Sequence, residues 1–285
     1  MADDFNLASA VWLHSIATPH ATAIAYKNQA LSYEQYACRA RDLAERLARS
    51  PDWQERSIKS HKVGIFASRG IDACVAMMGA CWAGAAYVPI GLKLPQEKIL
   101  AILATCELTA IIADEEGAKL LTDTVLAACP KTLIRVDQVM LEVDDNVSSS
   151  GHIDLSLQAK LSEPLRVAAD DLAYVIFTSG TTGAPKGVMI SACSAQSYVK
   201  TIVETLGLQA TDRALETCEL SFDFSVHNMF ATWQAGAALH ILPANLVMNA
   251  VKFARNEQLT VWNSVPSLAG MLQQIKALQP GSLPD

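Results

Sequence analysis

The sequence predicts an α/β protein whose layered, parallel-type sheets are covered by helices. Three observations indicate this fold class. Short apolar runs typical of buried strands alternate along the chain with longer helical segments, the order that parallel sheets require. The 285 residues include 51% hydrophobic and 18% charged side chains, which is enough apolar surface for a large core. The cysteines are scattered without metal-ligand spacing, so neither disulfides nor zinc need to hold the fold together.

The first half of the chain shows the alternation most clearly. Strands are expected at residues 62–68, 86–90, 109–114 and 131–137, and helices at residues 71–84, 95–108 and 117–129. Residues 73–90 carry no charge and reach the length of a membrane-spanning helix. Their alanine and glycine content, with Gly84 and Pro89 as breakers, instead favours a buried helix followed by a buried strand.

Residues 141–168 are acidic and serine-rich, and their weak periodicity is typical of a connection between structural units. We therefore expect a first α/β subdomain over residues 1–168 and an incomplete second one over residues 169–285. The second is expected to contain strands at residues 171–179, 187–191 and 259–265, and helices at residues 193–206, 225–233, 244–257 and from Pro266 onward.

Charge and the N-terminal residues narrow the function class. The net charge of −7 is spread along the chain, and no lysine- or arginine-rich stripe offers a surface for a nucleic-acid backbone. The N-terminal residues are acidic and lack the zones of a secretory signal. The sequence therefore predicts a cytoplasmic protein that binds neither nucleic acid nor membrane.

Residues 174–190, YVIFTSGTTGAPKGVMI, contain a loop rich in glycine, threonine and serine between two apolar strands. Glycine lets a ligand approach the backbone, and exposed N–H groups, hydroxyls and one lysine suit a polyphosphate. The P-loop of common nucleotidases differs, because its lysine opens a helix whereas a strand-like run follows Lys186. Composition alone also allows a flexible hairpin turn. The candidate phosphate-binding residues are Thr178, Ser179, Gly180, Thr181, Thr182, Gly183 and Lys186.

The string TSGTTGAPKG at residues 178–187 resembles the phosphate-binding signature of the adenylate-forming superfamily, which includes acyl-CoA synthetases, nonribosomal peptide synthetase adenylation domains and luciferases. Residues 31–47 and 81–99 are similar to two further motifs of that family, although Gly91 stands where the family usually has aspartate. The resemblance implies a two-step reaction with ATP and Mg²⁺ as cofactors. A carboxylate attacks the α-phosphorus to give an acyl-adenylate, and a thiol then takes the acyl group.

Residues 220–236 indicate which acid is activated. They resemble the F-D-x-S motif of amino-acid-activating domains, in which the aspartate at the position of Asp223 pairs with the substrate's α-ammonium group. By the same resemblance, Phe224, His227 and Asn263 fall on positions that line the side-chain pocket. A fatty acid would leave the Asp223 carboxylate unpaired, so an amino acid is preferred. The other interpretation is that Asp223 caps the helix that follows it.

The resemblance also implies the partners, an amino acid and a carrier protein with a phosphopantetheine thiol. Alanine- or proline-like substrates stay open, because the FDFSV form resembles that of stand-alone ligases that load small or cyclic amino acids onto carrier proteins. Two alternatives remain. One is an acyl-CoA or acyl-carrier-protein ligase for a non-amino acid, and the other is a non-catalytic binding or scaffold protein that keeps this part of the fold.

Some elements of the family have no counterpart in these residues. Ala192 and Cys193 follow the second strand where the family commonly has a histidine. The glutamate that holds Mg²⁺, the aspartate on the ribose and the lysine of the small C-terminal domain would all lie beyond residue 285. We therefore expect an N-terminal part of the large domain without a complete catalytic set or a metal ligand. Because the chemistry depends on those charges, this part is expected to be inactive alone.

Overall fold

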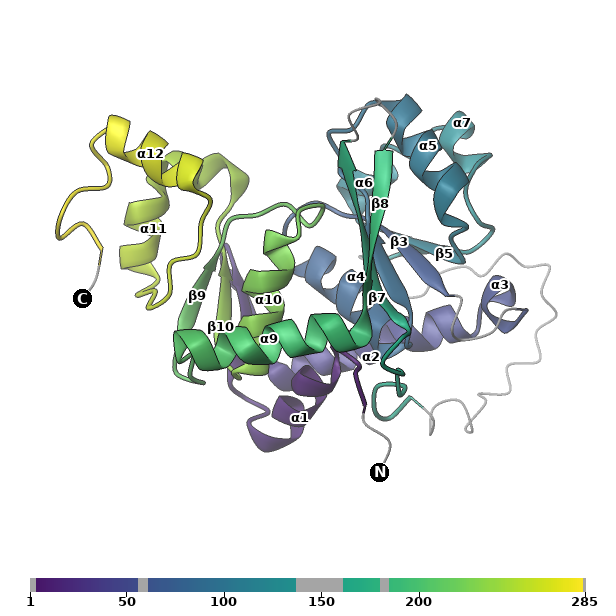
Figure 1. Ribbon diagram of the computed structural model, residues 1–285, viewed down its shortest axis with the longest axis horizontal. Helices are drawn as coiled ribbons and strands as arrows, with labels where there is room; N and C mark the ends of the chain where they lie inside the picture. The colour runs from purple at the N-terminus through teal and green to yellow at the C-terminus, as the bar shows by residue number, and fades with distance from the viewer. Residues whose placement is uncertain (1–3, 56–60, 137–160, 180–184, 284–285) are drawn as a thin grey trace.

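The computed structural model describes residues 4–55, 61–136, 161–179 and 185–283, which form two sheets flanked by helices (Figure 1). The strands are β1 (Thr22–Tyr26), β2 (Gln29–Ser32), β3 (Lys62–Phe66), β4 (Ala86–Pro89), β5 (Ala110–Ala113), β6 (Leu133–Arg135), β7 (Leu172–Ser179), β8 (Pro185–Ser191), β9 (Arg213–Glu216) and β10 (Ala238–Ile241). The larger sheet has the order β6-β5-β3-β4-β7-β8 and the smaller β2-β1-β10-β9. Pairing is parallel except between β1 and β2 and between β7 and β8. The expected α/β class with parallel-type sheets is confirmed.

Helices lie at the expected segments with two exceptions, and three further helices, which were not expected, precede β3. The helices are α1 (Ser9–Ala17), α2 (Tyr33–Ala48), α3 (Pro51–Gln54), α4 (Ile71–Trp82), α5 (Gln96–Cys106), α6 (Glu115–Ala118), α7 (Asp123–Leu126), α9 (Ala192–Leu206), α10 (Phe224–Gln234), α11 (Ala250–Asn256) and α12 (Pro266–Gln274), with the 3-10 helix η2 (Ala244–Asn249). The single helix expected at residues 117–129 is wrong, because Asp114 and Thr122 each cap a separate short helix. The helix expected at residues 244–257 begins as η2 and becomes α-helical only at Ala250.

The strand expected at residues 259–265 is reduced to an isolated bridge at Val261. Backbone hydrogen bonds link this segment to β9, from the Thr260 N–H to the Arg213 carbonyl oxygen at 3.0 Å and from the Leu215 N–H to the Val261 carbonyl oxygen at 3.0 Å. Thr260 Oγ1 donates to Asp212 Oδ1 at 2.7 Å and accepts the Arg213 backbone N–H at 3.0 Å. The hydroxyl bonds of Thr260 thus accompany the backbone pairing, and the segment adds one bridge beside β9 in place of a full strand.

Each sheet combines strands from both sides of residue 168. In the smaller sheet β1 pairs with β10, so that Ile24 lies opposite Leu239. In the larger sheet β4 pairs with β7, with Tyr87 opposite Tyr174. Strands that are far apart in the chain therefore stand side by side, and the division into subdomains at residue 168 stays a prediction.

The main core lies between the two sheets, where α4 and α10 are packed (Figure 1). Helix α4 is buried on nearly all sides, and an added Cβ at Gly79 would lie 2.8 Å from Leu43 Cδ2 on α2. The uncharged segment 73–90 is thus the buried helix and strand that the sequence predicts. Helix α5 covers the outer face of the larger sheet, and α11 and α12 cover that of the smaller. Within the described ranges, no helix has both the length and the apolar character needed to cross a bilayer.

Candidate functional site

The β7–β8 hairpin carries the predicted phosphate-binding residues. Its strands are antiparallel, Thr178 lies opposite Lys186, and Ser179 pairs with Pro185 at the end of the ladder. The glycine-rich segment is therefore a connection between two strands, as the sequence predicts. Outside the described residues lie Gly180, Thr181, Thr182 and Gly183.

Thr178 and Lys186 are both exposed beside this connection. Thr178 Oγ1 donates a hydrogen bond to the carbonyl oxygen of Lys186 at 3.5 Å, which leaves the lysine side chain out of the contact. Among the described residues, the Lys186 ammonium group has no ion-pair partner. An exposed cation next to a glycine-rich connection fits a polyphosphate such as the phosphate chain of ATP.

The segment 217–222 leads from the end of β9 to Asp223, the residue before α10. Asp223 occupies the N-cap position of α10, but its side chain makes no capping hydrogen bond. The helix-cap interpretation is therefore not supported. The Asp223 carboxylate is exposed and forms no hydrogen bond or ion pair with the part of the chain that the structure describes. It is accessible to a cationic ligand.

Three aromatic side chains, which we call the aromatic wall, stand near Asp223: Phe224, His227 and Tyr198. Phe224 and His227, one turn apart on α10, stack with ring centroids 5.1 Å apart and an interplanar angle of 8°. The hydroxyl group of Tyr198 on α9 is hydrogen-bonded to His227 Nδ1 at 2.9 Å. Burial lowers the pKa of His227, which favours the neutral imidazole. His227 is thus held as a wall residue by contacts on two sides.

The negative charge of Asp223 also affects the pKa values of two tyrosines on other elements. Burial raises the pKa of Tyr174 on β7 to about 12, and the negative charge of Asp223 adds to this shift. The pKa of Tyr198 is also raised, mainly by burial and to a smaller extent by the negative charge of Asp223. Both phenols therefore stay protonated at neutral pH. Sequence reasoning missed both tyrosines, since no local pattern links β7 and α9 to the start of α10.

Asn263 is the one predicted pocket residue that does not lie on α10 or next to its start. It is half-buried in the segment between the bridge at Val261 and α12. In the described residues it makes no hydrogen bond or ring contact with Asp223, Phe224 or His227. The structure brings those three residues together on consecutive turns, whereas the pocket role of Asn263 stays a prediction.

A buried carboxyl group lies at the other end of the segment 217–222. Glu216 is the last residue of β9, and only 2% of it is exposed. Its carboxyl group accepts a hydrogen bond from the Cys218 backbone N–H. Burial raises the pKa of Glu216 to about 8, and the Cys218 N–H, the nearby Asn228 amide and the Arg69 charge offset part of the shift. Glu216 is therefore mainly protonated at neutral pH. Sequence reasoning missed it, because nothing in the local sequence marks it as buried.

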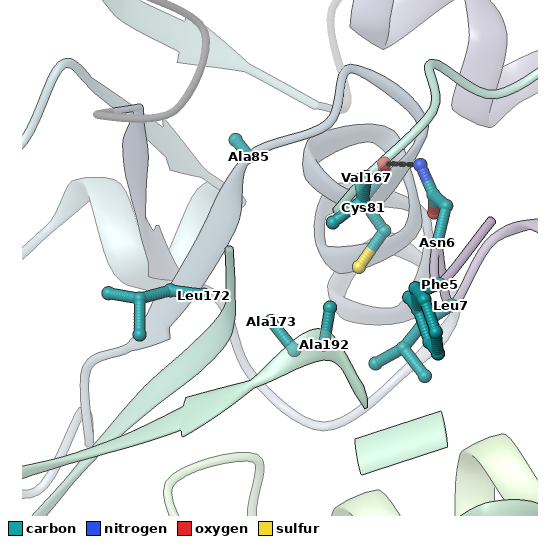
Figure 2. A pocket seen from close by; sticks show the side chains of 9 residues that line it. All are labelled: Phe5, Asn6, Leu7, Cys81, Ala85, Val167, Leu172, Ala173 and Ala192. Carbon is teal, nitrogen blue, oxygen red and sulfur yellow. Dashed lines mark hydrogen bonds between the residues drawn. The ribbon is translucent and has the colours of Figure 1, made fainter. Parts of the chain in front are cut away.

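The cavity in Figure 2 lies away from these residues, between the N-terminal segment, α4 and β7. Its lining is mostly apolar and consists of Phe5, Asn6, Leu7, Cys81, Ala85, Val167, Leu172, Ala173 and Ala192. The Asn6 side-chain amide already donates hydrogen bonds of 2.7 Å to the carbonyl oxygens of Cys81 and Leu165. The cavity is a packing gap in the core and not part of the candidate site.

The layered fold, the glycine- and threonine-rich hairpin and the F-D-x-S motif define the adenylate-forming class of enzymes. The chain belongs to the AMP-binding enzyme family, whose profile matches residues 14–283. It is 32% identical over 272 residues to a linear gramicidin synthase protein of Brevibacillus parabrevis, covering 94% of this chain and 5% of that protein. It is 27% identical over 266 residues to an L-proline–[L-prolyl-carrier protein] ligase of Pseudomonas fluorescens, covering 92% and 51%.

A solved structure agrees in fold. The Vibrio cholerae adenylation domain AlmE, crystallised in complex with glycyl-adenosine-5′-phosphate, superposes with a TM-score of 0.77 at 23% identity, over 100% of this chain and 54% of that one. The described fold matches the N-terminal large domain of adenylate-forming enzymes. The chain spans about half the length of the proline ligase and a small part of the gramicidin synthase.

Proposed function

We propose that the protein containing this chain activates an amino acid with ATP as an aminoacyl-adenylate and passes it to the phosphopantetheine thiol of a carrier protein. The observation that carries the proposal is the exposed, unbonded carboxylate of Asp223 beside the aromatic wall, in a chain of the AMP-binding family. Two named relatives support it. The first is an L-proline–[L-prolyl-carrier protein] ligase. The second is an adenylation domain that was crystallised with glycyl-adenosine-5′-phosphate.

In this proposal the β7–β8 hairpin holds the phosphates of ATP. The Lys186 ammonium group and the Thr178 hydroxyl bind phosphate oxygens, together with Ser179 and the connection from Gly180 to Gly183. When bound, Mg²⁺ would neutralise part of the phosphate charge. Among the described residues, no group of three or more His, Cys, Asp or Glu side chains is arranged to hold a metal ion. The resemblance to the family, and not this absence, is the reason that we assign the Mg²⁺ ligand to a part of the protein beyond residue 285.

Asp223 selects the substrate in this proposal. Its carboxylate pairs with the α-ammonium group, while Phe224, His227 and Asn263 contact the substrate side chain. A carboxylic acid without an amine would leave the Asp223 charge desolvated and unpaired, which costs binding free energy. The preference for an amino acid over a fatty acid follows from that difference.

We propose the catalytic turnover, the carrier-protein partner and the cellular location for the whole protein that contains this chain. Because this chain spans about half or less of the curated relatives, we propose that the 285-residue chain needs further parts of the protein for a complete reaction. The carrier protein would accept the acyl group after adenylation. Dependence on ATP and on a carrier protein fits a cytoplasmic location.

An ATP–pyrophosphate exchange assay tests this function. The full-length protein encoded by the reading frame and the 285-residue chain would each receive a panel of amino acids and amine-free carboxylic acids. We expect exchange by the full-length protein with one or a few amino acids, and none by the chain alone. Exchange only with amine-free acids would favour the acyl ligase alternative, and no exchange by the full-length protein with any acid would favour the scaffold alternative. Amino-acid-dependent exchange by the 285-residue chain would show that it is complete.

A further inference from the structure

The segment 217–222 sets the position of Asp223, because it joins the end of β9 to the start of α10. The end of the segment at Phe222 is hydrogen-bonded to the helix that follows. Ser225 Oγ donates to the carbonyl oxygen of Phe222 at 2.6 Å, and the Ser225 N–H donates to the same oxygen at 3.0 Å. These bonds fix the segment to the start of α10, and the contacts at Thr217 and Cys218 fix it at the end of β9.

Two side chains make hydrogen bonds to the other end of the segment, at Thr217 and Cys218. The carboxyl group of Glu216 folds forward to accept the Cys218 backbone N–H, which fixes the first turn of the segment after β9. The Arg69 guanidinium group, in the connection from β3 to α4, donates to the carbonyl oxygen of Thr217. These contacts join the smaller sheet to a loop of the larger one. They fix the backbone at the two residues that follow β9.

A buried carboxyl group is a costly way to end a strand, because desolvation disfavours polar groups that are not fully hydrogen-bonded. In the described residues, Glu216 Oε2 and both amide atoms of Asn228 make no hydrogen bond. Asn228 is fully buried on α10, and its amide lies beside the Glu216 carboxyl group. An apolar residue of similar size would avoid that cost, so a carboxyl group at this position suits a task other than packing.

We infer that Glu216 is a positioning residue for the amino-acid pocket: by holding the Cys218 amide, together with the Arg69 contact, it fixes the segment 217–222 and the place of Asp223. The effect on substrate rests on the proposed function, whereas the effect on the segment does not. Glu216 itself contacts no substrate and acts only through the backbone that leads to Asp223.

Two variants test the inference in the full-length protein. Glu216→Leu removes the acceptor while nearly keeping the size, and Glu216→Gln keeps an acceptor oxygen for the Cys218 N–H. Hydrogen exchange of the segment 217–223 reports the backbone directly. The KM values for amino acid and ATP, with kcat, report the pocket. Asp52→Asn is the matched control, because it changes another carboxylate that accepts a backbone N–H, that of Thr132, and lies half-buried on α3.

In Glu216→Leu we expect exchange of the Cys218 amide and the following amides to rise at least about tenfold. The KM for the amino acid should rise at least about tenfold, with the KM for ATP within about twofold. Glu216→Gln should stay within about threefold of wild type in both measurements, and Asp52→Asn should leave both KM values within about twofold. Unchanged amide hydrogen exchange of the segment in Glu216→Leu, or equal rises in both KM values, would overturn the inference. If wild type activates no amino acid, the proposed function fails, while the exchange data still decide whether Glu216 holds the segment.

Discussion

Glu216 and Asp223 show how the two ends of one segment give the same functional group opposite environments. The Glu216 carboxyl group is buried, and desolvation keeps it protonated near neutral pH. The Asp223 carboxylate is exposed and makes no capping bond. The first group therefore suits a structural role and the second suits contact with a ligand.

The raised pKa of Glu216 predicts how stability depends on pH. The folded chain holds this proton up to about pH 8, whereas the unfolded chain releases it near its ordinary pKa of 4.5. Between these values the folded state binds more protons, so the free energy of unfolding falls as the pH rises. Relative to Glu216→Gln, wild type should lose up to about 5 kcal/mol between about pH 4.5 and 8.

Urea unfolding of wild type and Glu216→Gln at about pH 5, 6, 7 and 8 measures this difference. The glutamine variant cancels the contributions of all other titrating groups, because both chains share them. Stability curves that run parallel over the whole range would contradict the raised pKa and the burial that causes it.

Part of the candidate site could be predicted from neighbouring residues alone. Phe224 and His227 are three residues apart on one helix, so their shared face follows from helical spacing. Tyr198 and Glu216 reach the same region only through the packing of α9 and the end of β9. Such contacts depend on tertiary structure, and no spacing rule within one segment reveals them.

At the scale of elements, the contact of α2 with α4 decides how tightly the main core closes. Leu43 of α2 packs directly over Gly79 of α4, and a Cβ at Gly79 would lie within 2.8 to 3.0 Å of three Leu43 atoms. Gly270 on α12 is the matched comparison, since an added Cβ there meets nothing within 4 Å. The same residue type thus serves close packing in one helix and has no packing role in the other.

Gly79→Ala should destabilise the chain by about 1–3 kcal/mol because it overpacks this contact. Gly270→Ala should stabilise it by about 0.5–1 kcal/mol, because alanine loses less backbone entropy in a helix. Urea unfolding of both variants, of Leu43→Ala and of Gly79→Ala/Leu43→Ala measures these effects. The double variant should be at least about 1 kcal/mol more stable than the sum of the single effects predicts. Strict additivity would contradict a direct clash with Leu43.

The elements themselves could be predicted where pattern and packing agree. The buried runs at β3, β4 and β5 and helices α4 and α5 lie where periodicity indicates them. The errors fall where polar side chains redirect the backbone. Asp114 and Thr122 each begin a new helix where periodicity predicts a single one. Which partner such a side chain finds depends on the folded neighbours.

At the scale of the whole molecule, the two sheets supply different parts of the candidate site. The larger sheet carries the β7–β8 hairpin with Lys186, and the smaller carries the segment that leads to Asp223. That segment lies between the sheets and contacts the larger one through Arg69 (Figure 1). Under the proposed function, the smaller sheet would supply the contact to the ammonium group of the substrate and the larger sheet the contacts to the phosphates of ATP.

The central claim is that Asp223 selects an amino acid, and the most direct measurement compares an activated amino acid with the same acid lacking its amine. Pyrophosphate exchange by the full-length protein would give kcat/KM for both acids in wild type, in Asp223→Ala and in Asp170→Ala, an exposed control before β7. Wild type and Asp170→Ala should prefer the amino acid at least about 100-fold, and Asp223→Ala should reduce this preference to less than about tenfold. An Asp223→Ala protein that keeps the full preference would contradict the account.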